Sequence, residues 1–296
     1  MTRALQPASS LGPLMRDMVD RALDPYLLVG MPHLTPNGLS ETWLMKELGH
    51  RHWLMLSREL GMQSADFRTA CGAEAYAAIC ATSLNAPGFG IVKANDILMI
   101  HSRIAPVSMT QTSTTHELFL EDQRIGDVEL ISTFVHREVA GSNHSIARVA
   151  VRKSRPQPFR ISHLAKTAAD IRNRRIEHHW GLPLDRNDVS RTFRFEPSPS
   201  QEFNGAGLFY FAEFQALADR ALEVWFPDKI PTTRREVYFL GNIDQNENVC
   251  FEIVGCCEKN ETIHGQLKRE TGKIIATMFI ASGETATGRD ETSRPI

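Results

Sequence analysis

The sequence lacks the signatures of several large protein classes. Its five cysteines form no Cys-x-x-Cys pair, and an odd number spread along the chain does not describe a disulfide framework, so we expect free thiols in a reducing compartment. Gly-x-Gly-x-x-Gly, P-loop and Gly-x-Ser-x-Gly motifs are missing, which disfavours nucleotide-dependent chemistry and serine hydrolysis. The adjacent pairs His178-His179 and Cys256-Cys257 have no recognised ligand spacing, so we expect no metal and no bound cofactor.

Strong net charge and long apolar runs are also missing. The formal net charge of −2 gives no global field that would hold a nucleic acid. No stretch reaches the roughly 18 uninterrupted apolar residues of a membrane span, and charged residues interrupt any signal-peptide core near the start. We therefore expect a soluble cytoplasmic protein with no nucleic-acid and no membrane partner.

What remains is the composition of an ordinary folded protein, with 42% hydrophobic and 23% charged residues. The 296 residues are about twice the typical domain length of roughly 100 to 200 residues. Two domains are therefore the first expectation.

The first half of the chain predicts a helix followed by antiparallel strands. Asn37-Gly38 precedes a helical pattern over 41–60, which Ser40 can cap and whose positive end suits Glu41. Strand-rich runs separated by turn residues follow at 74–84, 96–104, 107–120, 126–139 and 145–151.

The second half repeats this order. Asn204-Gly205-Ala206-Gly207 precedes residues 208–225, which are apolar around most of a helix and must be buried nearly all round. Short turns then join strand candidates at 236–243, 249–258, 262–270 and 273–281, which forces antiparallel neighbours. The two Asn-Gly pairs lie 167 residues apart, so the pattern suggests an internal duplication.

A helix enclosed by a curved antiparallel sheet is the hot-dog architecture, so the predicted fold is an α+β double hot dog. An α+β protein with unrelated halves is the alternative. The predicted parts are an N-terminal helical segment (1–27), a first hot-dog domain (28–152), a basic linker that becomes helical from Ser162 (153–195), a second hot-dog domain (196–282) and a flexible tail (283–296).

Several segments carry a resemblance to a known family. They are Gly30-Met31-Pro32-His33-Leu34, Gly38-Leu39-Ser40-Glu41-Thr42-Trp43-Leu44, Leu48-Gly49-His50-Arg51-His52-Trp53, Phe203-Asn204-Gly205-Ala206-Gly207-Leu208-Phe209-Tyr210-Phe211 and Tyr238-Phe239-Leu240-Gly241-Asn242-Ile243-Asp244. In these segments the chain resembles the bifunctional acyltransferase/decarboxylase family of leinamycin biosynthesis. The Asn-Gly-x-Gly segment is similar to many hot-dog thioesterases as well.

The resemblance implies an enzyme of polyketide biosynthesis. It would take methylmalonyl-CoA, transfer the acyl group to the phosphopantetheine of an acyl carrier protein, and release carbon dioxide. The family uses a tyrosine as acyl acceptor, and Tyr76 is the position that we match to it. The partners would be acyl-CoA and an acyl carrier protein, and a homodimer is optional.

The chemistry of a thioester predicts where the site lies. Its carbonyl oxygen gains charge during acyl transfer and during decarboxylation, and the free N–H groups at a helix start can stabilise that charge. The chain offers such donors twice. At 37–40, Asn37 and Ser40 are the candidate catalytic residues and Gly38 and Leu39 would contact the substrate. At the second place Asn204, Gly205 and Gly207 would contact the substrate, and Asn242 could bond the pantetheine arm. The alternative is that these residues only make turns and helix caps.

Tyr76 would need help as a nucleophile, because a phenol with a pKa of about 10 is protonated at neutral pH. His33 and His52 are the candidates for a neighbouring base or for a contact with the substrate carboxylate. Tyr76 and these histidines could also be packed structural residues.

The basic linker contains Arg172, Arg174 and Arg175, which could meet the phosphates of coenzyme A or an acidic carrier protein, although a solvated face is the usual role of such a charge run. Two other functions stay open. One is an acyl-CoA or acyl-carrier-protein thioesterase or dehydratase on the same scaffold, and the other is a non-catalytic module that binds acyl carrier proteins.

Overall fold

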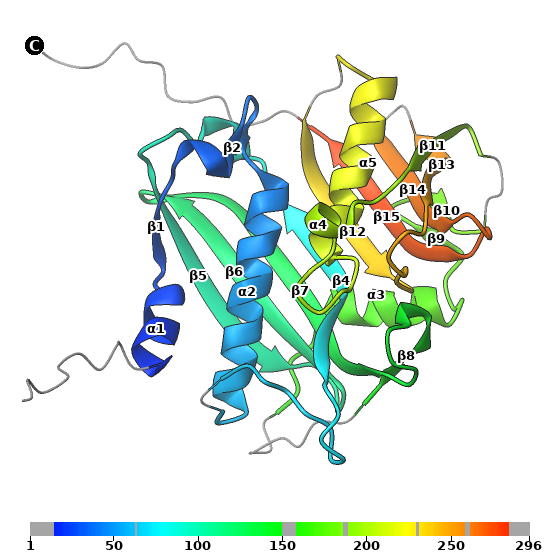
Figure 1. The fold of residues 1–296 in the computed structure, drawn as a ribbon. Coiled ribbons are helices and arrows are strands. Elements are labelled where there is room, and N and C mark those ends of the chain that lie inside the picture. The colour runs from blue at the N-terminus through cyan, green and yellow to red at the C-terminus, as the bar shows by residue number, and fades with distance from the viewer. Residues whose placement is uncertain are drawn as a thin grey trace, which may run out of the picture.

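The computed structural model describes residues 15–62, 64–149, 158–185, 189–228, 231–257 and 261–283. An 11-stranded antiparallel sheet runs through this part of the chain, and two long helices, α2 (Glu41–Glu59) and α5 (Phe211–Trp225), lie against it (Figure 1). None of the helices in the described ranges combines the length and the hydropathy that crossing a membrane requires.

The first unit wraps its strands around α2, which begins where Ser40 Oγ accepts a hydrogen bond from the Trp43 amide at 3.3 Å. Leu44, Met45 and Leu48 on α2 are buried against these strands. In spatial order the strands are β1 (Tyr26–Leu28), β5 (Ile97–Pro106), β6 (Gln111–Leu120), β7 (Gln123–Arg137) and β4 (Tyr76–Asn85), and β8 (Ile146–Arg148) pairs with the end of β7.

The second unit repeats the design around α5, whose apolar circumference is buried on most sides. Its strands follow in the order β12 (Thr232–Phe239), β15 (Ile274–Ser282), β14 (Thr262–Arg269), β13 (Val249–Cys257) and β11 (Arg191–Phe195). Each unit is therefore one helix wrapped by one antiparallel sheet, and the predicted double hot-dog fold is confirmed.

A strand pair joins the two units. β4 and β12 are antiparallel neighbours, with Asn85 opposite Arg234 and Ala81 opposite Tyr238, so the two sheets continue into one another. The two central helices also meet, because Lys46 Nζ on α2 lies 2.6 Å from Glu213 Oε1 on α5. The pairing of the strands thus brings the start of each helix close to the other unit.

The segment between the units covers the other face of the sheet. Helix α3 (His163–Arg172) begins at Ser162, whose Oγ accepts a hydrogen bond from the Ala165 amide, and buries apolar residues against Tyr238 and Phe279. Neighbouring residues of these strands belong to the core around α2 and α5. Because side chains alternate between the faces of a strand, α3 lies opposite the two long helices.

Short elements complete the described chain. They are α1 (Met15–Ala22), η1 (Met31–His33), β2 (Leu34–Thr35), β3 (Gly38–Leu39), η2 (Phe89–Ile91), η3 (Asn143–Ser145), β9 (His178–His179), β10 (Leu182–Pro183) and α4 (Pro199–Glu202).

Two predicted boundaries differ from the structure. The N-terminal helix ends at Ala22, and β1 then pairs with β5, so the boundary at residue 27 divides a strand of the first sheet. The predicted linker likewise contains β11, which pairs with β13 and places Phe193 opposite Phe251. Both strands are short edge strands, whose pairing partners lie far away in sequence. Apart from residue 283, the predicted tail lies outside the described residues.

Two glycines in adjacent strands provide a test of the packing. A Cβ atom at Gly265 would lie 2.5 Å from the ring of the fully buried Phe251, whereas one at Gly255 would make ordinary contacts. We expect Gly265→Ala to lower the free energy of unfolding by about 1–3 kcal/mol, because the ring has no room to move. Gly255→Ala is the matched control and should be close to neutral. Denaturant unfolding of both variants checks this, and equal effects would contradict the packing described.

Candidate active site

A cavity of about 840 Å³ lies between the two units. Its walls come from the second half of α2, the first half of β4, the end of β7, the 143–148 segment, the last residue of α3, the 204–211 loop and residues 239–242. Both hot-dog units and the connecting segment therefore contribute to it.

The start of α5 opens into this cavity. Tyr210 occupies the N-cap position and both Tyr210 and Phe211 line the cavity, but no side chain caps the helix. The first amides of a helix have no partner within it and carry the positive end of the helix dipole. The Glu213 amide donates to the Tyr210 carbonyl at 2.9 Å, so the amides of Phe211 and Ala212 are the ones without an acceptor among the described residues. This end of the helix can attract an oxygen atom that gains negative charge.

Two asparagines hold the loop that precedes α5 through hydrogen bonds to its backbone. Asn204 Oδ1 accepts hydrogen bonds from the amides of Ala206 and Leu208, each at 3.0 Å. Asn242 brackets Phe209, because its Oδ1 accepts from the Phe209 amide and its Nδ2 donates to the Phe209 carbonyl, both at 3.0 Å. Both asparagines line the cavity, but their amide groups shape the loop. The carbonyl oxygens of both amide groups are thus engaged by the loop.

Tyr76, the first residue of β4, lines the same cavity. Its hydroxyl donates to Glu74 Oε2 at 2.5 Å and accepts from Arg137 Nη1 at 3.0 Å. The Arg137 guanidinium also lies over the tyrosine ring, 5.2 Å from its centroid. The ionisable groups in hydrogen-bond contact with the Tyr76 hydroxyl are thus Glu74, two residues before it, and Arg137.

The cavity keeps its phenols protonated. Burial and the hydrogen bond to Glu74 raise the pKa of Tyr76, and the charge of Arg137 opposes this rise. Burial, with smaller contributions from Glu213 and Glu47, raises the pKa of Tyr210 to about 12. Neither phenol is a free phenolate at neutral pH, so Tyr76 can react only if Glu74 takes its proton during the attack.

Asn143 ties the first unit to the loop that precedes α5. Its side chain accepts from Arg137 Nε at 2.8 Å and donates to the carbonyls of Gly207 and Ile243, each at 2.7 Å. Arg137 Nη2 reaches the Ala206 carbonyl at 2.6 Å. Gly207 itself has a φ of +68° and is not in the cavity wall. These buried contacts hold Tyr76 and the start of α5 in one arrangement.

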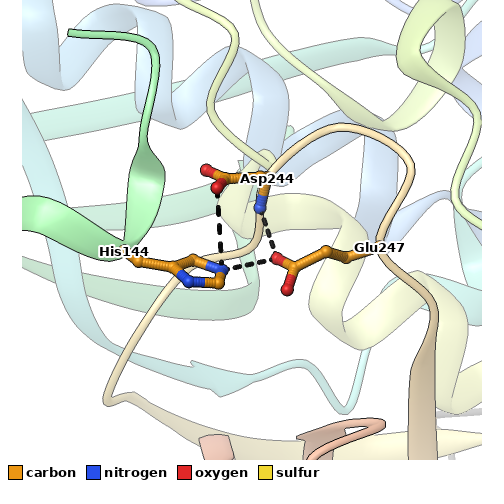
Figure 2. Close-up of side chains that lie close together, drawn as sticks. All are labelled: His144, Asp244 and Glu247. Atoms are coloured by element: carbon orange, nitrogen blue, oxygen red, sulfur yellow. Dashed lines mark hydrogen bonds and ion pairs between the residues drawn. The ribbon is translucent and has the colours of Figure 1, made fainter. Parts of the chain in front are cut away.

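Next to Asn143, the side chains of His144, Asp244 and Glu247 form a cluster, of which His144 lines the cavity (Figure 2). His144 Nε2 lies 2.6 Å from Glu247 Oε2 and 3.8 Å from Asp244 Oδ2, and the Asp244 amide donates to Glu247 Oε2 at 2.6 Å. Their ligand atoms lie within 4.8 Å of one another, as a metal site would require. The mutual hydrogen bonds account for this geometry, so we assign the cluster a role in joining the units.

The start of α2, in contrast, does not reach the cavity. Asn37 is exposed in the turn between β2 and β3, and Leu39 is buried in the core. Gly38 has a φ of +101°, and a Cβ atom there would collide with the Phe89 carbonyl. Ser40 is occupied as the cap of α2. The expectation that these four residues bind a ligand finds no open site, because turn and cap geometry use them.

A buried ion cluster also closes this helix start. Arg235 Nη2 on β12 lies 3.3 Å from Glu41 Oε2 and 2.5 Å from Asp219 Oδ1, and Arg235 Nη1 donates to the Gln215 carbonyl on α5. The Arg235 side chain is 2% exposed. Side chains of the second unit therefore pack against the start of α2, whereas the start of α5 borders a cavity.

The two histidines proposed beside Tyr76 have other roles. His33 does not line the cavity, since its Nδ1 accepts from the Gly30 amide and its ring stacks on Trp43 with centroids 4.3 Å apart. His52 borders the cavity, but both ring nitrogens are engaged, with Thr114 Oγ1 at 2.8 Å and Ser132 Oγ at 2.7 Å. Burial lowers the pKa of His52 to about 3, so it is neutral. The Tyr76 hydroxyl contacts Glu74 and Arg137, and neither histidine is among its hydrogen-bond partners.

The structure brings together Tyr76, His52, Asn204, Gly205 and Asn242 in the cavity wall, and it leaves out His33, Asn37, Gly38, Leu39, Ser40 and Gly207. Sequence reasoning missed Glu74, Arg137 and Asn143. Glu74 was within reach, since it lies two residues before Tyr76. Arg137 and Asn143 follow from the pairing of β7 with β4 and carry no local motif.

Comparisons with known proteins identify the fold. The sequence matches no protein-family model and no curated protein. The structure is similar to that of an acyl-ACP thioesterase from Bacteroides thetaiotaomicron, with a TM-score of 0.61 and 9% identity, covering 86% of this chain and 95% of that one. It is also similar to the 12:0-ACP thioesterase from Umbellularia californica, with a TM-score of 0.64 and 6% identity, covering 86% and 94%. At such identities the likeness establishes the fold, and this chain is a double hot-dog protein.

The two Asn-Gly pairs allow a matched test of which helix start is open. Gly38→Ala should lower the free energy of unfolding by about 2 kcal/mol or more, because it adds both a strained φ and a collision with backbone. Gly205→Ala should change it by less than about 0.5 kcal/mol, since a Cβ atom there meets nothing within 4 Å. Thermal or denaturant unfolding measures both, and a reversed order would contradict the assignment.

The ion cluster predicts a pH dependence of stability. Burial raises the pKa of Glu41 from its ordinary value of 4.5, against the opposing charge of Arg235. The native state then binds a proton that the unfolded state releases, so this contribution to stability is complete below pH 4.5 and is lost as the pH rises through the native pKa. Relative to Glu41→Gln, the wild-type chain should lose about 1.4 kcal/mol for each unit of that shift.

Denaturant unfolding between pH 4 and pH 8 measures this difference. Glu223→Gln, at an exposed position of α5, is the control. A difference that stays constant with pH, or that grows in favour of the wild type, would contradict the burial of the Glu41 carboxylate.

Proposed function

We propose that the protein acts on an acyl thioester carried by a phosphopantetheine arm, and that it is an acyltransferase/decarboxylase. The single observation that carries this proposal is the uncapped start of α5, which faces a large cavity opposite the Tyr76–Glu74 pair. The likeness to two structures described as acyl-ACP thioesterases supports the substrate class. The segments that resemble the leinamycin-type family support the specific reaction.

The geometry suggests how acyl transfer would proceed. The thioester carbonyl oxygen would lie at the amides that begin α5, which stabilise the charge that develops there. The Tyr76 oxygen attacks the carbonyl carbon, its proton passes to Glu74, and the thiolate of coenzyme A leaves and is protonated. Arg137 can stabilise the tyrosine oxygen through its 3.0 Å contact. The thiol of the carrier protein then attacks the acyl-tyrosine, which restores the phenol.

Decarboxylation would need no additional base. The substrate carboxylate loses carbon dioxide, the electron pair forms an enolate whose oxygen lies at the same amides, and the α-carbon takes up a proton. Phe209, Phe211 and Phe214 in the cavity wall give surroundings poor in solvating charge for this step. We propose methylmalonyl-CoA as the acyl donor and a propionyl-carrier protein as the product.

Intact mass spectrometry of a phosphopantetheinylated carrier protein, after incubation with methylmalonyl-CoA, tests the reaction. We expect a propionyl adduct with the wild-type enzyme, loss of that adduct with Tyr76→Phe, and a rate lowered by roughly 10²- to 10⁴-fold with Glu74→Gln, which removes the base. Tyr26→Phe, on exposed β1, is the matched control and should behave like the wild type.

The outcomes separate the competing functions. Absence of any acylation of the carrier would end the transferase proposal. Free acid without carrier loading would favour a thioesterase, which the two structural neighbours make the second candidate. Full activity of Tyr76→Phe would remove the tyrosine from the chemistry.

A further inference from the structure

The wall of the cavity has more cationic than anionic side chains. Three arginines and a lysine join Arg137 there, whereas the chain as a whole has a net charge of −2. The carboxylates of the wall, Asp66 and Glu74, both form ion pairs with Arg68, which lies outside it, at 2.8 and 3.9 Å. The cationic residues of the wall are Arg137, Arg148, Arg172, Arg269 and Lys273.

Two of these arginines are already used by the fold. Arg137 contacts Asn143, Tyr76 and the Ala206 carbonyl, and the buried Arg269 donates to the Asn242 carbonyl at 3.1 Å through Nε. Their hydrogen-bonding groups hold the loops around the start of α5. They have little capacity left for a ligand.

Arg148 and Arg172 differ from them. Both side chains are exposed at the cavity, and among the described residues no carboxylate lies within 4.0 Å of either guanidinium. Arg172 Nη2 donates to the Phe239 carbonyl at 2.8 Å, and the other nitrogens of this guanidinium have no hydrogen-bond partner among the described residues. Arg148 has no hydrogen-bond partner in the described part of the chain. Two guanidinium groups with unused donors therefore border the same space.

The two charges act on the same part of the wall. Arg172 is the last residue of α3, and Arg148 ends β8 of the first unit. Desolvation and then the charge of Arg148 lower the pKa of Arg172, and both arginines oppose the rise that burial causes in the pKa of the Cys80 thiol. Two like charges that border one cavity, with no counter-ion among the described residues, attract an anion, and guanidinium groups match the oxygens of a phosphate.

We propose that Arg148 and Arg172 bind the phosphate group of the phosphopantetheine arm, both when the arm belongs to coenzyme A and when it is attached to a carrier protein. This inference deepens the proposed function and rests on it for the identity of the arm. A phosphate at these exposed residues remains in contact with water, while the arm carries the thioester inward to the start of α5. The segment between the two hot-dog units is then part of the binding site.

Calorimetric binding of ligands that cannot react tests the pair directly. The probes are coenzyme A, phosphopantetheine and pantetheine, of which the last has no phosphate. We expect Arg148→Ala and Arg172→Ala each to weaken the binding of coenzyme A and phosphopantetheine by roughly 10-fold or more, since hydrogen bonds to charged groups are strong. Binding of pantetheine should be unchanged, so the wild-type preference for the phosphorylated arm should disappear in the double variant.

Control measurements separate the loss of a phosphate contact from other effects of the substitutions. Arg175→Ala removes an exposed arginine three residues beyond Arg172 that does not line the cavity, and it should bind all probes like the wild type. Arg148→Ala removes a side chain that makes no hydrogen bond to the described residues, so we expect it to leave the folded state intact, and thermal unfolding checks this. A holo carrier protein titrated against the same variants tests the second source of the arm.

Three results would overturn the proposal. One is unchanged phosphopantetheine binding in the double variant, and another is an equal loss for pantetheine. The third is a loss confined to coenzyme A, which would assign the arginines to the phosphates of its nucleotide part. Because no turnover is measured, loss of phosphate-dependent binding in the variants would stand even if the acyl-transfer reaction were not found, and the two hypotheses can fail separately.

Discussion

The antiparallel pairing of β4 with β12 is the constraint from which the site arises. It merges two sheets that would otherwise have free edges, and unpaired edges are a liability for any sheet. It also brings α2 and α5 together, where the Lys46–Glu213 ion pair links them. The cavity lies between the two units that this junction joins. Tyr76 begins one of the two joining strands, and its place opposite α5 follows from the same pairing.

An internal duplication alone would give two equivalent helix starts, but the starts of α2 and α5 differ. At α2, the Ser40 cap and the Glu41–Arg235 ion pair use the groups that could hold a ligand. At α5 the N-cap residue is Tyr210, which offers no side-chain acceptor to the helix, and its carbonyl accepts only from the Glu213 amide, so among the described residues the amides of Phe211 and Ala212 have no acceptor. A cap contributes about 1 kcal/mol to a helix. The missing cap at α5 thus forgoes stability at the point where the cavity needs donors, which is typical of a functional position.

The sequence predicted the elements whose signals are local. Helix α2 followed from the Ser40 cap and its acidic first turn, and α5 followed from an apolar circumference that only burial can explain. Strand β11 was assigned to the linker, because five residues of an edge strand carry little pattern until their partner β13 is known.

The site was predicted only in part for the same reason. Tyr76, Asn204 and Asn242 lie in segments with local motifs, and all three border the cavity. Arg137 and Asn143 come from a strand end and the turn after it, and their importance depends on contacts with the loop at 204–208, more than 60 residues away. The two Asn-Gly pairs look alike in sequence, and only the packing around Gly38 distinguishes a structural turn from an open site.

The electrostatics of the cavity limit the mechanisms that it can support. A phenol whose pKa is raised cannot wait as a phenolate, so nucleophilic use of Tyr76 requires that the proton and the new bond move together. The 2.5 Å contact with Glu74 provides the only short path for that proton among the described neighbours of the hydroxyl, since the other contact, Arg137, is itself a donor. Arg137 would have a second effect in the proposed mechanism, because its charge would stabilise the oxygen as the proton departs. The same residue bonds Asn143 and Ala206, so the group that contacts Tyr76 also holds the loop before α5. In the proposed reaction, attack and oxyanion stabilisation would thereby be linked through one side chain of the first unit.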